Sequence, residues 1–313
     1  MCTDTFNSQF PTFIPPFQSL SHSLAREKNI QLDVLRLDLV HPKISGNKWY
    51  KLKYNLRAAI THGADCIASF GGAFSNHIHA LAAAGSYLGL ETMGFIRGHK
   101  PKLLSPTLKD AAEMGMQLIY LDRASYQEKH LPEQRSILAN QFIDNSRSVY
   151  WVPEGGSNLL AVQGTQEIAE NEQVKQFDYI FAACGTGGTL AGLIKGAANH
   201  QQIIGVPVLK GGGFLQGVIE GFLRDSGLEE KKQWHLWLDG HWGGYGKTNE
   251  QLHQFILSIE KDYALPLDPI YTGKLVWRVL EGIKRDEIPA GSRVLIIHSG
   301  GLQGRRGFPQ YYK

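Results

Sequence analysis

Short apolar runs alternate with helical stretches along much of this chain, and this order constrains its fold more than any other feature. Strands that are separated by single helices pair in parallel through right-handed crossovers. We therefore expect an α/β protein with mainly parallel sheets, although the pattern between Ser226 and Lys247 is unclear. The expected strands are 65–70, 92–96, 117–121, 179–183, 203–209 and 293–298, and the expected helices are 50–59, 75–88, 106–114, 189–199 and 273–285.

The length of the chain predicts more than one compact unit. Its 313 residues exceed a typical single core and fit two domains. Glycine-rich stretches at 43–48 and 154–158 are typical of junctions. We place a large domain at 1–50 and 156–313, and a smaller inserted domain at 51–155.

Composition argues against several classes of partner. Charged residues make up 19% of the chain and leave a formal net charge of +3, so neither a nucleic-acid partner nor a membrane surface is expected. No segment approaches the roughly 20 apolar residues of a membrane span, and the first 20 residues lack a leader pattern. Three widely spaced cysteines suggest neither a disulfide framework nor a zinc site. We expect a cytoplasmic protein with a small substrate.

The run Ala183–Gly192 (ACGTGGTLAG) follows an apolar strand and opens a helix. Backbone N–H groups at such a junction, together with the positive end of the helix dipole, favour a phosphate group. A dinucleotide fingerprint would need glycine where Leu190 stands, and a P-loop would need a lysine before Lys195. One monophosphate is the better fit, and an ordinary tight turn is the alternative.

Ser75-Asn76-His77 stands at the start of an expected helix and follows a glycine pair. Helix capping accounts for these residue types. The functional alternative is that they line the carboxyl edge of a parallel sheet, where ligands bind. His77 and His79 form an H-x-H pair, but residues two apart on a helix do not share a face, so no metal site is predicted.

Lys48 lies in Gly46-Asn47-Lys48, a turn expected to lead into the helix at 50–59. A lysine in such a place is usually a solvated surface charge. Its neighbours change this interpretation, because several motifs at compatible spacing resemble one family. They are GNKWYKLKY at 46–54, FGGAFSNH at 70–77, GTGGTLAG at 185–192, DPIYTGK at 268–274 and HSGG at 298–301.

The chain is similar in these motifs to the pyridoxal-5'-phosphate (PLP) dependent D-cysteine desulfhydrases and 1-aminocyclopropane-1-carboxylate (ACC) deaminases. The motifs occur in the family's order, and the similarity runs from about Pro15 to Phe308. The resemblance implies the type II PLP-dependent fold, related to the tryptophan synthase β chain. That fold has two three-layer αβα domains with mainly parallel sheets, and PLP is the cofactor. We also expect a homodimer that acts on a small amino-acid substrate.

The resemblance assigns roles residue by residue. Lys48 resembles the Schiff-base lysine, and Lys51 a second lysine near the phosphate. Asn76 resembles the residue that hydrogen-bonds the 3'-hydroxyl of the cofactor, and Ser75 the serine on the substrate side. The remaining matches are the phosphate loop Gly185, Thr186, Gly187, Gly188 and Thr189, the active-site tyrosines Tyr271 and Tyr245, of which Tyr245 rests on a shorter match, and Thr272 beside the ring nitrogen.

Two positions separate the branches of this family. The ACC deaminases have a glutamate after the tyrosine of D-P-V-Y, where this chain has Thr272, and leucine before the final glycine pair, where it has Ser299. An uncharged hydroxyl suits the milder electron sink that is sufficient for β-elimination. D-cysteine breakdown to pyruvate, sulfide and ammonia is therefore the expected reaction, and ACC deamination to 2-oxobutyrate is the alternative.

Two alternatives belong to other classes. A non-catalytic PLP-binding homologue would keep the fold without turnover, but the presence of Lys48, Ser75 and Tyr271 argues against it. A serine hydrolase built on His298-Ser299 would need the first glycine of G-x-S-x-G, and Ile297 stands there instead.

Overall fold

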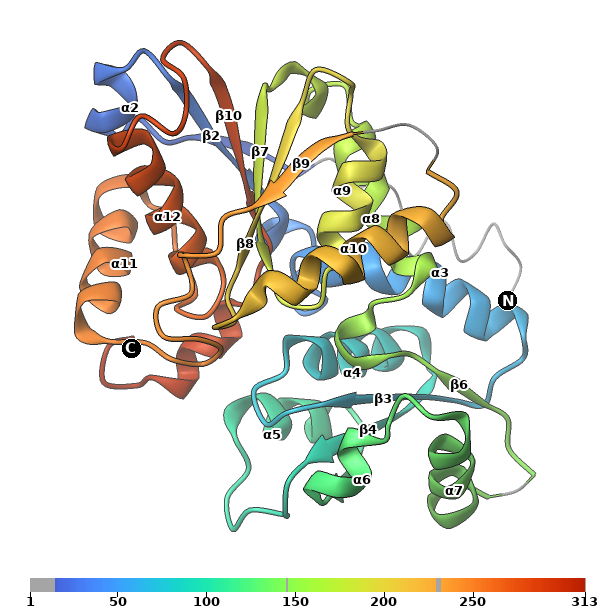
Figure 1. Cartoon of the computed structure of the whole chain (residues 1–313). Helices are drawn as coiled ribbons and strands as arrows, with labels where there is room; N and C mark the ends of the chain where they lie inside the picture. The colour runs from blue at the N-terminus through green and yellow to red at the C-terminus, as the bar shows by residue number, and fades with distance from the viewer. Residues whose placement is uncertain (1–14, 145, 229–231, 313) are drawn as a thin grey trace. The chain divides into compact units, whose positions relative to one another are not determined.

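The computed structural model describes residues 15–144, 146–228 and 232–312 (Figure 1). These residues form two compact units. One comprises residues 52–157, and the larger unit comprises residues 15–51 and 158–312. That the larger unit is a cofactor-binding domain, with boundaries at 50/51 and 155/156, stays a prediction.

The described part of the larger unit contains a six-stranded sheet. Its first two strands in spatial order pair antiparallel, and the other neighbours pair in parallel. In the middle of the sheet, Leu295 lies opposite Ile180, and Ile180 lies opposite Ile203. The strands in spatial order are β1 (Phe17–Ser19), β2 (Gln31–Arg36), β10 (Arg293–His298), β7 (Tyr179–Cys184), β8 (Gln202–Pro207) and β9 (Gln233–Leu236).

Helices cover both faces of this sheet, which explains why the interiors of its central strands are apolar rather than alternating. The helices are α2 (Ser23–Glu27), α8 (Leu159–Glu170), α9 (Gly188–Gly196), α10 (Leu215–Asp225), α11 (Glu250–Tyr263) and α12 (Thr272–Lys284). Figure 1 shows α11 and α12 on one face and α8 and α9 on the other. Beneath α11 and α12 lies a continuous core to which Phe181 and Ile296 belong. Helices α8 and α9 approach so closely that a Cβ on Gly192 would lie 2.0 Å from Thr165 Oγ1.

The 52–157 unit contains a four-stranded parallel sheet among its described residues. Its strands in spatial order are β5 (Gln117–Leu121), β4 (Glu91–Arg97), β3 (Cys66–Gly71) and β6 (Val149–Trp151). Its helices are α4 (Asn76–Leu88), α5 (Pro106–Glu113), α6 (Arg123–Gln127) and α7 (Pro132–Phe142). The aromatic rings of Phe70, Phe95 and Trp151, with centroids 5.3 to 5.5 Å apart, fill the core under α6 and α7, and both phenylalanine rings stack on Trp151.

The expected α/β class with mainly parallel sheets is confirmed, but some expected boundaries are wrong. The helix expected at 189–199 is α9, which ends at Gly196, and the strand expected at 203–209 is β8, which ends at Pro207. The helix expected at 50–59 is α3 (Asn47–Thr61), which begins three residues earlier. Gly46 has φ +68°, and the chain enters the helix directly after it. Lys48 therefore lies in the first turn of α3 rather than in a preceding turn. The unclear segment 226–247 supplies β9 and the loop that follows it. Across the described ranges, no helix combines the length and apolar character needed to cross a bilayer.

Candidate functional site

The motifs of the larger unit meet at the carboxyl ends of its central parallel strands. β7 leads into the 185–189 loop, and β10 leads into Ser299-Gly300-Gly301. The Ser299 carbonyl accepts a hydrogen bond from the Asn47 N–H at 3.2 Å. A Cβ on Gly46 would lie only 1.9 Å from that carbonyl oxygen, so the contact requires glycine. The G-N-K and H-S-G-G motifs are thus packed against each other through their backbones.

Lys48 is half-buried, and a short chain of side chains orients it. Its ammonium donates to Asn47 Oδ1 at 3.0 Å, and Asn47 Nδ2 donates to Thr189 Oγ1 at 2.8 Å. Burial lowers the pKa of Lys48 to about 8, although part of its side chain stays accessible. A lysine with this pKa has a substantial neutral fraction near neutral pH, and a neutral amine is both a nucleophile and a base.

The 185–189 loop has the geometry of an anion site. Gly187 has φ +80° and precedes α9, whose first turn has no side-chain cap. Its backbone N–H groups therefore point out of the helix end toward a common region. The Lys51 side chain is 1% exposed, and its Nζ lies 3.5 Å from Thr186 Oγ1. Burial and then the positive charge of Lys48 lower the pKa of Lys51 well below its usual value.

These donors fit the phosphate of PLP. A half-buried and a buried amine beside an uncapped helix N-terminus are stabilised by an anion, because the anion offsets both the desolvation and the mutual repulsion of the amines. Lys51 and the 185–189 backbone are the groups that would hold this phosphate, and Lys48 is the amine that would bond to the cofactor.

The two expected tyrosines lie together in the larger unit. Tyr271 immediately precedes α12, and a Cβ on Gly185 would lie 3.3 Å from its ring, which places Tyr271 beside the phosphate loop. The Tyr245 and Tyr271 rings meet edge to face with centroids 6.1 Å apart, and their hydroxyl oxygens are 3.5 Å apart. Tyr245 is half exposed and lies in the loop after β9.

Thr272 is buried at the first position of α12 and takes part in a helix cap. Its hydroxyl donates to Asp268 Oδ2 at 2.7 Å and accepts from the Asp268 N–H at 2.8 Å. The Asp268 carboxylate also accepts the backbone N–H groups of Ile270, Tyr271 and Thr272 at 2.8 to 2.9 Å. The expectation that Thr272 faces the cofactor ring stays a prediction.

Ser75 and Asn76 belong to the 52–157 unit, at the junction of β3 and α4. Ser75 is the N-cap of α4 and accepts from the Ile78 N–H at 3.2 Å, as the capping interpretation predicts. Both side chains are partly exposed. Their expected roles toward substrate and cofactor stay predictions.

The two histidines of the H-x-H pair have different partners. His77 Nε2 lies 2.8 Å from Ser69 Oγ, and His79 Nε2 lies 3.1 Å from Asp110 Oδ2. Among the described residues, no three His, Cys, Asp or Glu side chains form a group that could hold a metal ion.

Sequence reasoning missed two residues of this constellation. Asn47 links Lys48 to Thr189, and Asp268 caps the helix that carries Thr272. Both stand inside motifs quoted for their neighbours. For Asp268 a usable signal existed, because an aspartate just before a helix commonly accepts from the backbone N–H groups that follow it.

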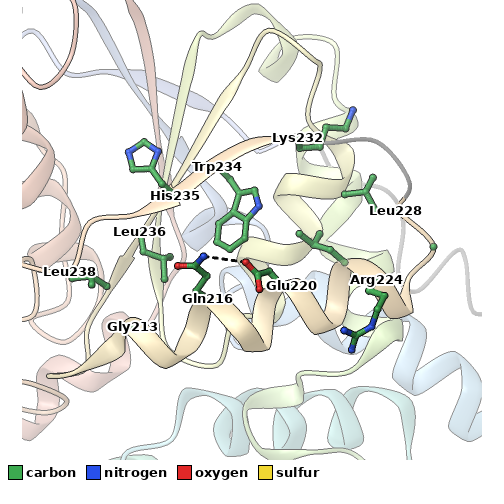
Figure 2. A pocket seen from close by; sticks show the side chains of 12 residues that line it. Gly213, Gln216, Glu220, Arg224, Leu228, Lys232, Trp234, His235, Leu236 and Leu238 are labelled. Carbon is green, nitrogen blue, oxygen red and sulfur yellow. Dashed lines mark hydrogen bonds between the residues drawn. The ribbon is translucent and has the colours of Figure 1, made fainter.

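A separate hollow of about 830 Å³ lies along α10 and β9. Figure 2 shows its lining, in which Gln216 donates to Glu220 at 3.1 Å. None of the expected site residues lines it. This hollow is therefore not part of the constellation around Lys48.

Comparison with known proteins gives consistent results. A protein from Pyrococcus horikoshii named putative 1-aminocyclopropane-1-carboxylate deaminase is 31% identical over 92% of this chain and 90% of its own length. An Arabidopsis thaliana protein named bifunctional D-cysteine desulfhydrase/1-aminocyclopropane-1-carboxylate deaminase, mitochondrial, is 27% identical over 88% of this chain and 73% of its own. The crystal structure of an ACC deaminase homologue matches with a TM-score of 0.81 and 28% identity, over 99% of this chain and 98% of that one.

The fold and the sequence also agree on the wider family. The structural match to an ACC deaminase homologue and the mainly parallel described sheets agree with the type II fold that the motifs imply. Residues 20–300 match the family described as pyridoxal-phosphate dependent enzyme. Pyridoxal phosphate is accordingly the cofactor, and the chain belongs to the family of pyridoxal-phosphate dependent enzymes.

Proposed function

We propose that this enzyme breaks down D-cysteine by α,β-elimination. D-cysteine and water would give pyruvate, hydrogen sulfide and ammonia. The names of the relatives support breakdown of a small amino acid, and they include both a D-cysteine desulfhydrase and ACC deaminases. The choice between these two reactions rests on this chain's own residues.

The observation that carries the choice is the environment of Thr272. Its side chain is 1% exposed, and its only hydroxyl proton is donated to Asp268. The ACC deaminases that this chain resembles have a glutamate at this position, whose charge can keep a proton on the ring nitrogen of the cofactor. Thr272 offers no charge there, and the charge of Asp268 is shared among three backbone N–H groups and the hydroxyl. Such a site favours elimination over the opening of a cyclopropane ring.

Lys48 is the proposed base. When bound, pyridoxal phosphate supplies the electron sink for negative charge that develops at the substrate α-carbon. With a pKa of about 8, roughly a tenth of the Lys48 amine is neutral at pH 7. Asn47 accepts one N–H of this amine and restricts its direction. Lys48 would therefore be able to accept the α-proton of a substrate whenever its amine is not bonded to the cofactor.

The remaining proposed roles concern binding. Lys51 and the 185–189 loop would hold the phosphate, and Tyr271, which lies beside Gly185, would face the reacting atoms. From the resemblance we also propose that Ser75 contacts the substrate and that Asn76 contacts the cofactor hydroxyl.

A direct comparison of two substrates tests the proposal. The holoenzyme is supplied with D-cysteine or ACC, and sulfide, pyruvate and 2-oxobutyrate are measured. We expect kcat/KM for D-cysteine to exceed that for ACC by at least about a hundredfold, or about 2.7 kcal/mol. Sulfide and pyruvate should appear in equal amounts. Comparable turnover of ACC would instead establish the deaminase reaction.

Variants at the two discriminating positions sharpen this test. The double variant Thr272→Glu, Ser299→Leu should raise ACC turnover and lower elimination, and the two changes need not add, because both act on one ring. Thr272→Ser keeps a hydroxyl and is the matched control, so it should retain the preference for D-cysteine.

A further inference from the structure

Lys274 is a buried lysine for which the proposed reaction has no use. It occupies the third position of α12, and its side chain is fully inaccessible. An ammonium group is costly to bury, and near a helix N-terminus it also faces the positive end of the helix dipole. Burial lowers the pKa of Lys274 to about 8, and the nearby Asp268 carboxylate opposes this shift. Because burying this ammonium group is unfavourable, the hydrogen-bond partners of Lys274 indicate why a lysine stands here.

Lys274 holds the loop that follows β9, residues 239–247. Its Nζ donates to the carbonyl oxygen of His241 at 3.0 Å and to that of Gly244 at 2.8 Å. Both carbonyls also accept backbone N–H groups within the loop, from Gly244 and Lys247 respectively. Lys274 thus closes a turn from inside by joining two of its carbonyl groups.

The 239–247 loop needs such support because its backbone is unusual. Positive φ values occur at Trp242 (+49°), Gly243 (+86°), Gly244 (+123°) and Gly246 (+70°). Glycines at these positions permit the turn, but they also give the chain many other conformations when nothing holds it. Contacts from outside the loop therefore add to its own hydrogen bonds in selecting this conformation.

Two other residues of α12 contact the same loop. Trp277 packs edge to face on Trp242 with ring centroids 4.6 Å apart, and Arg278 Nε donates to Asp239 Oδ1 at 2.5 Å. Positions 274, 277 and 278 share one face of a helix. Tyr271 stands at the start of that helix, and Tyr245 stands in the loop, so one rigid element determines the separation of the two tyrosines.

We propose that Lys274 is a positioning residue that clamps the 239–247 loop to α12 and thereby sets Tyr245 against Tyr271. The clamp follows from the contacts of Lys274 alone. Its importance for turnover rests on the proposed role of Tyr245 in the reaction. The two parts are therefore tested by different measurements.

The first measurement is hydrogen exchange of the holoenzyme, which does not depend on activity. Lys274→Met keeps the length of the side chain and removes its donors. We expect amides of residues 242–246 to exchange at least tenfold faster in this variant. Lys284→Met, in the exposed last turn of α12, is the control and should leave these rates unchanged. Unchanged exchange in Lys274→Met would overturn the clamp, whatever substrate the enzyme uses.

The second measurement is a double-mutant cycle between Lys274→Met and Tyr245→Phe. It uses whichever substrate the wild-type holoenzyme turns over. The cycle can therefore be measured even if D-cysteine proves not to be the substrate. Lys274→Met should lower kcat/KM at least tenfold in the wild-type background and less than twofold when Tyr245→Phe is already present. PLP affinity should change less than threefold. Additive effects, or a Tyr245→Phe variant with full activity, would show that Lys274 does not act through Tyr245.

A second variant protects the test against misfolding. If Lys274→Met does not yield folded protein, Trp277→Leu removes the neighbouring contact to Trp242 and leaves Lys274 intact. Faster exchange at 242–246 and the same non-additivity with Tyr245→Phe are again expected. Wild-type exchange in Trp277→Leu would count against α12 as the element that holds the loop.

Discussion

The starts of two helices in the larger unit each carry a lysine whose pKa is lowered to about 8, and the two lysines are held differently. At the start of α3, Lys48 is half-buried and has one side-chain acceptor, Asn47 Oδ1. At the start of α12, Lys274 is fully buried and has two backbone acceptors, the carbonyls of His241 and Gly244. A lowered pKa alone therefore does not separate a reactive lysine from a structural one.

The two lysines differ in the number of hydrogen bonds that must break before the amine can react. Lys48 can turn away from Asn47 at the loss of one hydrogen bond, whereas Lys274 would have to abandon two carbonyls in a fully buried place. Buried groups that lose their partners are penalised by about 1–3 kcal/mol each. We infer that accessibility and the number of fixed acceptors, taken together, identify the reactive lysine.

The largest expected effect comes from removing Lys48. Lys48→Ala should lower kcat by at least about a thousandfold, since both the covalent attachment and the base are lost. Borohydride treatment of the wild-type holoenzyme should trap the cofactor on the peptide that contains Lys48, and mass spectrometry would identify it.

The matched control for this prediction is Lys274→Met. It should still trap the cofactor on Lys48, because Lys274 has no proposed covalent role. A trapped peptide that contains Lys51 or Lys195 instead would contradict the assignment of Lys48 as the reactive lysine. The contrast between a reactive Lys48 and a structural Lys274 would then fail.

A smaller effect is expected in the pH dependence of stability. The pKa of Lys274 falls from 10.5 to about 8 on folding, so between these pH values the unfolded chain binds more protons than the folded one. Lys274 should therefore add stability as the pH rises from 8 to 10.5, by on the order of 3 kcal/mol at most, and should contribute no pH dependence below pH 8.

Urea unfolding of the holoenzyme at pH 7, 8, 9 and 10 would measure this contribution. The free energy of unfolding of the wild type should gain on that of Lys274→Met above pH 8. Lys284→Met should follow the wild type, because that side chain is largely exposed. Parallel curves for wild type and Lys274→Met would mean that Lys274 does not enter the folded state with a lowered pKa.

The smallest expected effect concerns the cap at the start of α12. Thr272→Val removes a hydroxyl that is both donor and acceptor to the buried Asp268, so the free energy of unfolding should fall by about 2 kcal/mol. Thr272→Ser retains both hydrogen bonds and should cost less than about 1 kcal/mol. Urea unfolding at pH 7 would compare the two variants. Equal stability of the valine variant and the wild type would show that the cap contributes nothing.

Local patterns in the sequence predicted much of the fold and part of the site. The apolar runs predicted the central strands, and Ser75 was predicted as an N-cap from its place before an apolar helix. The expected start of α3 was wrong, because the contact that lets the chain turn at Gly46 comes from Ser299, which is distant in sequence. The sequence places Lys274 only at the end of the 268–274 motif and assigns it no role. Its burial depends on a loop some thirty residues earlier, which no local pattern reveals.

The contact between Gly46 and Ser299 bears on how substrate preference could change during evolution. Ser299 contacts the turn before Lys48 through its backbone carbonyl group. Any residue at 299 keeps this carbonyl group, whereas a Cβ at position 46 would collide with it. A lineage could therefore change the residue at 299, and with it the substrate preference, while this backbone contact is kept. Substitution at position 299 can therefore change substrate preference without loss of the backbone contact that supports the turn before Lys48.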